Sequence, residues 1–292
     1  MEVPEDLVEQ IRKENCVVFV GAGLSQGAGL PGWKELLYKM LDWGEKNGMS
    51  QADRTELENE IEKDNLLFVA EEMRERMGKE NFQKFMVRTF KKSGIKPTDT
   101  HKLLPRIHFA AALTSNYDKL LESAYKVKPD QVFTHSDYPQ LAEFLYAQKF
   151  YVLKVHGTVD RIETIILGRK DYREVMHNNQ AYHQHLMTLF STKTVLFLGC
   201  GLTDPDLMTI LDELQATFKG HTVKHYALMN DVSEIRQRRY KEDYNIHIIP
   251  YTPSAPNHPE VREFLNELIA RTTLGKLSNV PDLPAHYLSR PD

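Results

Sequence analysis

Four short segments of this chain combine glycines with polar side chains that could bind or act on a nucleotide. The first, Gly21-Ala22-Gly23-Leu24-Ser25, directly follows the apolar run Cys16–Val20. Glycine has no Cβ, so closely spaced glycines let backbone N–H groups approach a pyrophosphate. The spacing differs from G-x-G-x-x-G and from G-x-x-x-x-G-K-[ST], which disfavours a dehydrogenase and a phosphate-loop ATPase. The turn predicts a dinucleotide site of another kind, although a glycine-rich connection without a ligand has the same pattern.

The second segment, Thr114-Ser115-Asn116-Tyr117-Asp118, follows the apolar run Phe109–Leu113. Ligands of open α/β sheets bind outside the carboxyl ends of the strands, where these polar groups would lie. Asn116 could orient a water or a ribose hydroxyl, and Asp118 could accept a hydrogen bond from a carboxamide. The alternative is that Asp118 forms an Asx turn and caps the helix predicted after it.

The remaining two segments also end apolar runs. His156-Gly157 follows Tyr151–Val155, and a histidine can act as a general base because its ordinary pKa is near neutrality. A lone histidine can equally have a structural role. Gly199-Cys200-Gly201 follows Thr194–Leu198 and could line a phosphate or ribose, or form only a tight turn. Thr203 or Asp204 could cap the helix predicted after this turn.

Short apolar runs separated by helical patterns predict an α/β fold, with a Rossmann-like, mostly parallel sheet flanked by helices on both faces. The predicted strands are 16–20, 109–113, 151–155, 164–167, 194–198, 224–229 and 245–249. The predicted helices are 33–43, a long helical region from 52 to about 90, 182–190, 206–218 and 261–270.

No repeat, low-complexity stretch or Gly/Ser linker marks a domain boundary. We expect one domain over residues 1–275, with a helical insertion at about 35–105 and an irregular tail over 276–292.

Composition sets limits on the partners. Apolar residues make up 41% and charged residues 27%, as in ordinary globular proteins, and the net charge of −4 predicts no direct nucleic-acid binding. No apolar run approaches the ~20 residues that span a bilayer, and the acidic N-terminus is unlike a signal peptide. We therefore expect no membrane association and a cytoplasmic location, with Cys16 and Cys200 as reduced thiols.

The order of these motifs along the chain resembles that of the sirtuin family. Gly21–Ser25 followed by Gly29-Leu30-Pro31 looks like the G-A-G-x-S…G-I-P turn of sirtuins. Ser115–Asp118 resembles T-Q-N-x-D, and His156-Gly157 resembles the catalytic H-G. Gly199-Cys200-Gly201 takes the place of G-T-S, and Leu228-Met229-Asn230 resembles a strand end that contacts the adenosine ribose.

The departures from the family also carry information. Deacylating sirtuins have a four-cysteine zinc module, which two distant cysteines cannot form, so no zinc or other metal is expected. The segment Gly32-Trp33-Lys34 replaces the D-F-R of the family motif. These changes are similar to those of divergent prokaryotic sirtuin-like NADases of anti-phage defence systems.

The resemblance implies that NAD is a substrate cleaved to nicotinamide and ADP-ribose. It implies that Asp118 binds the carboxamide, that Asn116 positions a ribose hydroxyl or water, and that His156 is the general base. It assigns NAD binding to Gly21, Ala22, Gly23, Ser25, Trp33, Ser115, Gly199, Gly201 and Asn230, although a core role for Trp33 stays open.

Such an effector must be restrained, so we expect a homo-oligomer, possible control by a separate regulatory partner such as a DNA-translocase-type ATPase, and a helical insertion that forms an assembly surface. Two alternatives remain: an NAD- or ADP-ribose-binding sensor without catalysis, and an NAD-dependent protein deacylase.

Overall fold

The computed structural model describes residues 2–277, in which one parallel sheet of seven strands forms the centre of the fold. The strand order is β3-β4-β2-β1-β5-β6-β7, and every neighbouring pair is parallel. The strands are β1 (Cys16–Val20), β2 (Ala112–Thr114), β3 (Val132–Thr134), β4 (Val152–Lys154), β5 (Thr194–Leu198), β6 (His225–Asn230) and β7 (Ile246–Tyr251). The predicted α/β class with a parallel sheet is therefore confirmed.

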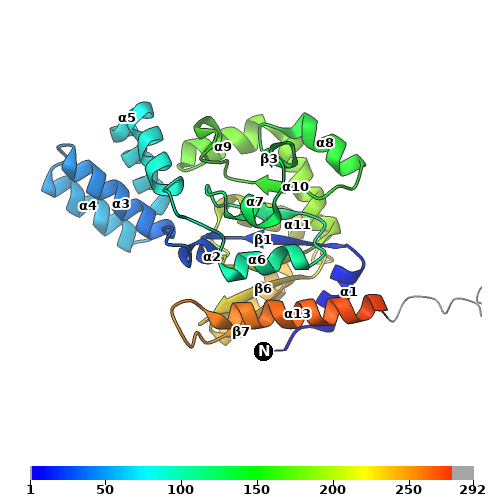
Figure 1. The fold of residues 1–292 in the computed structure, drawn as a ribbon. Helices are drawn as coiled ribbons and strands as arrows, with labels where there is room; N and C mark the ends of the chain where they lie inside the picture. Colours follow the sequence, from blue (N-terminus) through cyan, green and yellow to red (C-terminus); the bar gives the residue numbers. More distant parts are fainter. Residues whose placement is uncertain (1, 278–292) are drawn as a thin grey trace, which may run out of the picture.

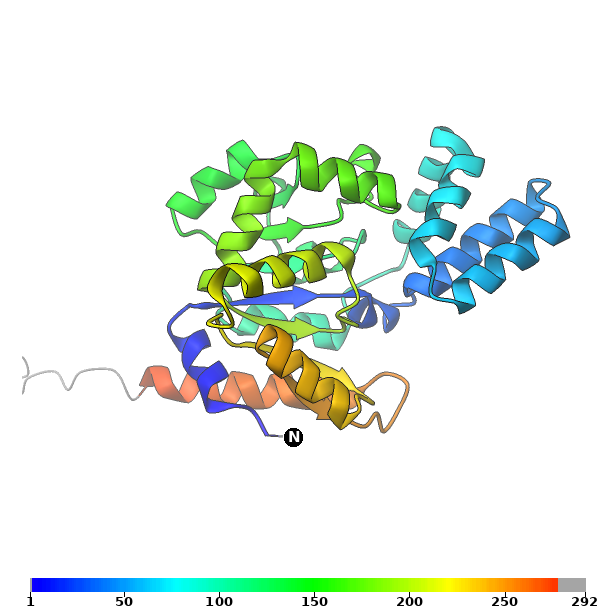
Figure 2. The ribbon, with the colours of Figure 1, turned by 180° about the vertical axis from the view of Figure 1, so that it is seen from behind.

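Helices cover both faces of this sheet. Helices α1, α6, α7 and α13 pack on one face (Figure 1), and α8 to α12 pack on the other (Figure 2). A strand covered on both faces needs apolar residues throughout, and all five residues of β1 are buried. The helices of these two layers are α1 (Glu5–Arg12), α6 (Asp99–Leu103), α7 (Leu120–Tyr125), α8 (Tyr138–Tyr146), α9 (Arg169–Asn178), α10 (Gln180–Thr192), α11 (Pro205–Phe218), α12 (Glu234–Tyr244) and α13 (Pro259–Leu277).

Three further helices between β1 and β2 form a separate unit, which we call the helical module: α3 (Trp33–Lys46), α4 (Gln51–Glu62) and α5 (Leu66–Phe90). The short helix α2 (Ala22–Gln26) joins β1 to this module, which lies beyond the end toward which β1 points (Figure 2). The module has its own apolar core, which continues into Tyr117 and Val159 of the sheet domain. It therefore packs against the loops that follow β2 and β4.

The strand predictions are confirmed for six of the seven strands and wrong in two respects. No strand forms at the predicted 164–167: Thr164 ends the 3-10 helix η3 (Ile162–Thr164), and the next residues are buried in loop packing. Ile165 and Leu167 pack on the core of the helical module, whereas Ile166 packs on one face of the sheet without forming a strand. The prediction also missed β3, a three-residue edge strand preceded by the 3-10 helix η2 (Pro129–Gln131), which is too short for a periodic signal.

The predicted helices are present with different breaks and ends, and the prediction missed others, among them α1, α8 and α12. The region 52–90 contains two helices, and α5 is kinked at Gly78, which has φ 65° and ψ 167°. The 3-10 helix η1 (Leu104–Arg106) continues α6. Helix α13 includes residues 276 and 277 of the predicted irregular tail, and the rest of that tail lies outside the described residues.

Candidate functional site

The sequence-predicted segments follow strands that are neighbours in the sheet. The order β4-β2-β1-β5 places the ends of these four strands side by side. Strands β2 to β4 lie on one side of β1 and β5 to β7 on the other, so the strand order reverses at β1. In doubly wound folds the crevice at such a reversal is the usual ligand site. The glycine turn, the Asn116 segment, His156 and Gly199 all lie at this edge.

The two glycine turns pack directly against each other. Gly21 N–H donates to the Leu198 carbonyl at 2.9 Å, and Gly23 N–H donates to the Gly199 carbonyl at 3.0 Å. A Cβ on Gly21 would lie 2.5 Å from the Gly199 oxygen, and Gly199 itself has φ +64°. Close approach of the loops after β1 and β5 therefore requires these glycines, whether or not a ligand binds.

Ser25, Asn116 and Asp118 form a hydrogen-bonded cluster, which we call the amide half of the site. Asn116 Nδ2 donates to Ser25 Oγ at 3.0 Å and to the Gly21 carbonyl at 3.1 Å. Ser25 Oγ donates to Asp118 Oδ2 at 2.8 Å. All three side chains are buried, so the cluster fixes the loop after β2 against the glycine turn.

The strand-end residue Thr114 holds the first residues of this loop. Its hydroxyl donates to the Val20 carbonyl at 2.7 Å and accepts from the Asn116 N–H at 3.0 Å. Asp118 Oδ1 accepts from the Leu120 N–H at 2.8 Å, at the start of α7. The helix-capping alternative for Asp118 is therefore realised, together with its contact to Ser25.

His156 belongs to a second group, which we call the histidine half. Its Nε2 lies 3.0 Å from Asp204 Oδ2, and its ring meets that of Tyr172 edge-on, with centroids 5.3 Å apart. Asp204 Oδ1 accepts from the Leu207 N–H at 3.2 Å, so this carboxylate also caps α11. A carboxylate on one imidazole nitrogen orients the ring and sets its tautomer.

Sequence reasoning had given Asp204 only a capping role and had not considered Tyr172. The position of Asp204 soon after the Gly199 turn was a usable signal, because the turns after β4 and β5 lie at the same edge. Tyr172 gave no signal, since its contact depends on how α9 crosses the site.

The loop after His156 is closed tightly at its base. Gly157 has φ +80°, and a Cβ there would lie 2.0 Å from the Thr164 carbonyl oxygen. Thr164 Oγ1 donates to the Arg161 carbonyl at 2.6 Å and accepts from the Thr158 N–H at 3.2 Å. The Ile166 N–H donates to the His156 carbonyl at 3.0 Å, so the two ends of the loop are joined.

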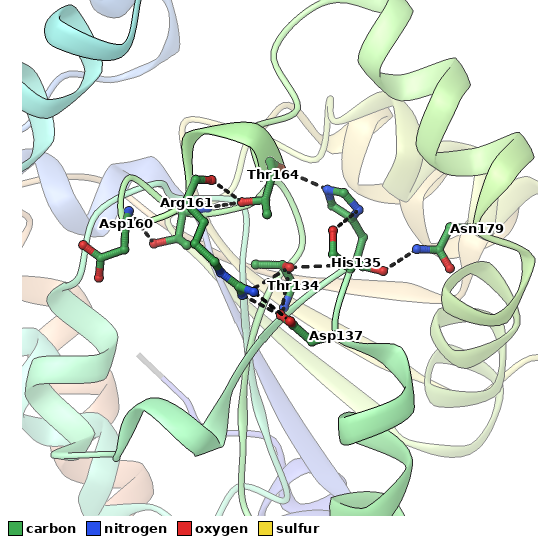
Figure 3. Close-up of polar contacts among 9 residues, drawn as sticks. Thr134, His135, Asp137, Asp160, Arg161, Thr164 and Asn179 are labelled. Atoms are coloured by element: carbon green, nitrogen blue, oxygen red, sulfur yellow. Dashed lines mark hydrogen bonds and ion pairs between the residues drawn. The ribbon is translucent and has the colours of Figure 1, made fainter.

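The outer side of this loop is anchored to the end of β3 (Figure 3). Arg161 forms a two-pronged ion pair with Asp137, with Nη1 2.7 Å from Oδ1. His135 Nε2 lies 3.0 Å from the Thr164 carbonyl oxygen, and the Asn179 amide donates to the His135 carbonyl. Burial lowers the pKa of His135, so a neutral ring donates its Nε2–H to Thr164 near pH 7.

The other predicted residues lie apart from these two halves. Trp33 is half-buried at the start of α3 and packs on the core of the helical module, which is the alternative considered for it. Asn230 is exposed at the end of β6, with its amide 3.0 Å from Asp231 Oδ2. Ser115 is half-buried beside Asn116, and Gly201 is exposed two residues after Gly199.

Both cysteines are free thiols. Burial raises the pKa of Cys16 and of Cys200, so neither is a thiolate near neutral pH. Among residues 2–277 no three His, Cys, Asp or Glu side chains are grouped so that they could hold a metal ion. Within the same range no helix is both long and apolar enough to cross a membrane.

A cleft of about 780 Å³ lies between the helical module and the loop after His156. Val159, Asp160 and Ile162 line it from the loop, and α5 lines it near the kink at Gly78. Helix α9 forms a third wall, joined to α5 by ion pairs of Asp171 with Arg74 and of Lys170 with Glu71 and Glu75.

This sheet, with its polar loops gathered at a strand-order reversal, defines a doubly wound α/β protein. Residues 110–249 match the sequence profile of the SIR2-like domain. The matched range includes Asn116, Asp118 and His156, whereas the first glycine turn precedes it.

Curated relatives extend the similarity over most of the chain. NAD(+) hydrolase ThsA of Cytobacillus dafuensis is 26% identical over 233 residues, which is 78% of this chain and 44% of that protein. The protein of the same name from Acinetobacter baumannii is 27% identical over 234 residues, 78% of this chain and 45% of that protein. Defense-associated sirtuin 2 of Bacillus subtilis is 25% identical over 258 residues, 85% of this chain and 24% of that protein. This chain thus spans less than half the length of these relatives.

A solved structure from work on sirtuin substrate affinity aligns with 91% of this chain and 98% of its own, at 14% identity and a TM-score of 0.44.

Proposed function

We propose that this chain is an NAD hydrolase that cleaves the nicotinamide N-glycosidic bond and acts as an NAD-depleting effector of an anti-phage defence system. The observation that carries the proposal is the buried Ser25–Asn116–Asp118 cluster, which lies against the glycine turn next to the strand that leads to His156. The names of the relatives, NAD(+) hydrolase and defense-associated sirtuin, support the activity and the biological role.

In this proposal NAD lies across the ends of the central strands. The backbone of Gly21, Ala22 and Gly23 holds the pyrophosphate with Ser25, while Gly199 and Gly201 line it from the neighbouring turn. Ser115 and Asn230 contact the riboses, and Trp33 borders the nicotinamide end. A carboxylate has about four lone-pair positions, so Asp118 can accept from the nicotinamide carboxamide while keeping its two internal donors.

The bond that breaks joins C1′ of the ribose to the pyridinium nitrogen. Its electron pair passes to the nicotinamide ring, which leaves neutral, and C1′ develops oxocarbenium character as in glycoside hydrolysis. The oxygen of a water molecule then bonds to C1′, and His156 accepts the proton that the water loses. The products are nicotinamide, ADP-ribose and one proton.

Asn116 can orient the ribose hydroxyl or the water in this step. Both hydrogens of its amide are donated to Gly21 and Ser25, and no described residue donates to its Oδ1. That oxygen is therefore the group that Asn116 offers to a ligand. Asp204 lies on Nε2 of His156 and orients its ring, which suits a general base.

Control of the activity forms the second part of the proposal. Uncontrolled NAD loss is toxic to the cell, so we propose that activity depends on homo-oligomerisation or on a separate partner such as a DNA-translocase-type ATPase. The helical module, which extends away from the sheet (Figure 1), is the assembly surface in this scheme. In this proposal the protein acts on NAD in the cytoplasm, without zinc, membrane association or direct nucleic-acid binding.

One observation favours a sensor that binds NAD or ADP-ribose without catalysis. Both carboxylate oxygens of Asp118 and the amide nitrogen of Asn116 already have internal partners, as in a rigid binding site. To test this, the purified chain is incubated with NAD over a range of protein concentrations, with and without an acetyl-lysine peptide. The amounts of nicotinamide, ADP-ribose and deacetylated peptide are then measured. Equimolar nicotinamide and ADP-ribose, independent of peptide, is the expected result. Tight binding without turnover at any concentration indicates the sensor, and peptide-dependent release indicates a deacylase.

A further inference from the structure

Lys154 is the last residue of β4, two residues before His156, and its side chain is fully buried. Lysine is among the residues least often buried, because removing an ammonium group from water is costly unless it is paired. A lysine at this position therefore needs a reason beyond filling space.

Its partners come from the segment that carries the amide half. The Lys154 ammonium donates to the Asp118 carbonyl and lies 3.2 Å from Glu122 Oε1 in α7. Thr114 and Lys154 are opposite each other in the pairing of β2 and β4. Lys154 thus links the strand that leads to His156 with the loop that contains Asn116 and Asp118.

Stability alone is a weak explanation for this pair. Replacing a buried ion pair by apolar side chains of similar volume is often neutral or stabilising. Glu122 is itself buried, and within the described part of the chain its Oε2 has no hydrogen-bond partner. The pair is therefore incompletely compensated, whereas its contact with the Asp118 carbonyl is directional.

The contact with Asp118 reaches the rest of the amide half. The same residue whose carbonyl Lys154 holds also accepts a hydrogen bond from Ser25 through its carboxylate, and Ser25 accepts one from Asn116. We propose that Lys154 is a positioning residue that fixes the amide half relative to His156, so that both groups meet the same nicotinamide ribose. This inference rests on the proposed NAD hydrolysis.

The test is the double variant Lys154→Met/Glu122→Met, which removes both charges together. Lys154→Met alone leaves Glu122 buried and unpaired and can fail to fold, whereas the double variant leaves no unpaired charge. The matched control is Lys13→Met/Glu9→Met, which removes an exposed ion pair of α1 before the amino end of β1. Thermal unfolding, ADP-ribose affinity, kcat and KM are measured for wild type and both variants.

We expect the Lys154/Glu122 variant to fold with a Tm near or above that of wild type and to bind ADP-ribose. Its kcat is expected to fall about 100-fold, the size of loss that a misplaced reacting group produces. The control should match wild type in kcat. An Lys154/Glu122 variant with wild-type kcat, or one that does not fold, overturns the positioning role. A wild-type protein that binds NAD without turnover defeats the proposed function instead, so the two failures are distinguishable.

Discussion

The amide half and the histidine half of the site are built in different ways. Ser25, Asn116 and Asp118 are 2%, 8% and 3% exposed and bond to one another and to the backbone of Gly21 and of α7. His156 relies on Asp204, whose side chain is 20% exposed, and on a loop anchored by Arg161, whose side chain is 37% exposed. The first half is preorganised for binding, whereas the second is placed by contacts that solvent can reach. Under the proposed function, we expect ground-state binding to depend chiefly on the amide half and the proton transfer on the histidine half.

The largest expected effect is on the chemical step. His156→Ala removes the proposed general base, and we expect kcat for nicotinamide release to fall by about 10²–10⁴-fold. ADP-ribose affinity, measured by calorimetry, should stay near that of wild type because the amide half is intact. Ser25→Ala, the matched change in the amide half, should weaken ADP-ribose binding more than His156→Ala does. If ADP-ribose binds more weakly to His156→Ala than to Ser25→Ala, the assignment of binding to the amide half is contradicted.

The loop after His156 gives the next largest effect. In Gly157→Ala the new Cβ meets the Thr164 carbonyl at a residue with φ +80°, so we expect a loss of about 3 kcal/mol in unfolding free energy and a lower kcat. The control is Gly220→Ala, where φ is +84° and nothing lies within 4 Å of the added Cβ. Its loss should be about 1 kcal/mol with unchanged kcat. If urea unfolding gives equal losses of unfolding free energy for the two variants, the positive φ alone destabilises Gly157→Ala and the contact with Thr164 adds nothing.

Acid pH tests the burial of the region next to the amide half. His101 is fully buried in α6, with Nδ1 2.8 Å from Thr98 Oγ1. Burial lowers its pKa to about 4, with the charge of Asp118 opposing the shift. Between the unfolded pKa of about 6.5 and this value, the unfolded chain takes up a proton that the folded protein does not. The unfolding free energy should therefore drop by about 2 kcal/mol for this residue as the pH falls from neutral to about 5.

The matched variant is His101→Asn, which keeps a partner for Thr98 and cannot titrate in this range. Burial also lowers the pKa of His185 and His225 to about 4, so some slope should remain. Chemical denaturation at both pH values should show a smaller drop in the variant than in wild type. Identical drops show that His101 is solvated in the folded protein.

The smallest effect is expected at the exposed anchor of the histidine half. Burial acts to raise the pKa of Asp137, but hydrogen bonds from Arg161 and Thr134 outweigh it and hold this pKa below its usual value. The anchor is therefore intact above about pH 4 and is lost as the pH falls through the folded-state pKa. Arg161→Gln should cost about 0.5–1 kcal/mol, because a partly exposed ion pair is screened by solvent. We expect a several-fold decrease in kcat with unchanged ADP-ribose affinity, and a fall in affinity contradicts a role confined to this loop.

The sequence predicted the parts of this architecture that depend on local patterns. Apolar runs that end at glycine or at polar residues located β1, β2, β4 and β5 within a few residues, and the ends of these strands carry the predicted segments. What it could not provide were long-range contacts. No local pattern showed that positions 21 and 199 must both be glycine, because the steric requirement arises only when the loops after β1 and β5 pack together.

The errors have the same origin. Residues 164–167 have the apolar character of a strand, yet Ile165 and Leu167 pack on the helical module and Ile166 packs on one face of the sheet. Lys154 would be read from sequence as an exposed residue at a strand end, and only the pairing of β2 and β4 places it beneath Asp118. Asp204 looked like a helix cap, and the structure adds its contact with His156.

The most direct test of the account is a crystal structure of His156→Ala soaked with NAD, since the variant should bind NAD without cleaving it. The account predicts intact NAD with its pyrophosphate at Gly21–Ser25, its carboxamide on Asp118, and its nicotinamide ribose between Asn116 and the position vacated by His156. NAD bound instead in the cleft between α5 and α9, or with its nicotinamide end away from both halves, would contradict the account.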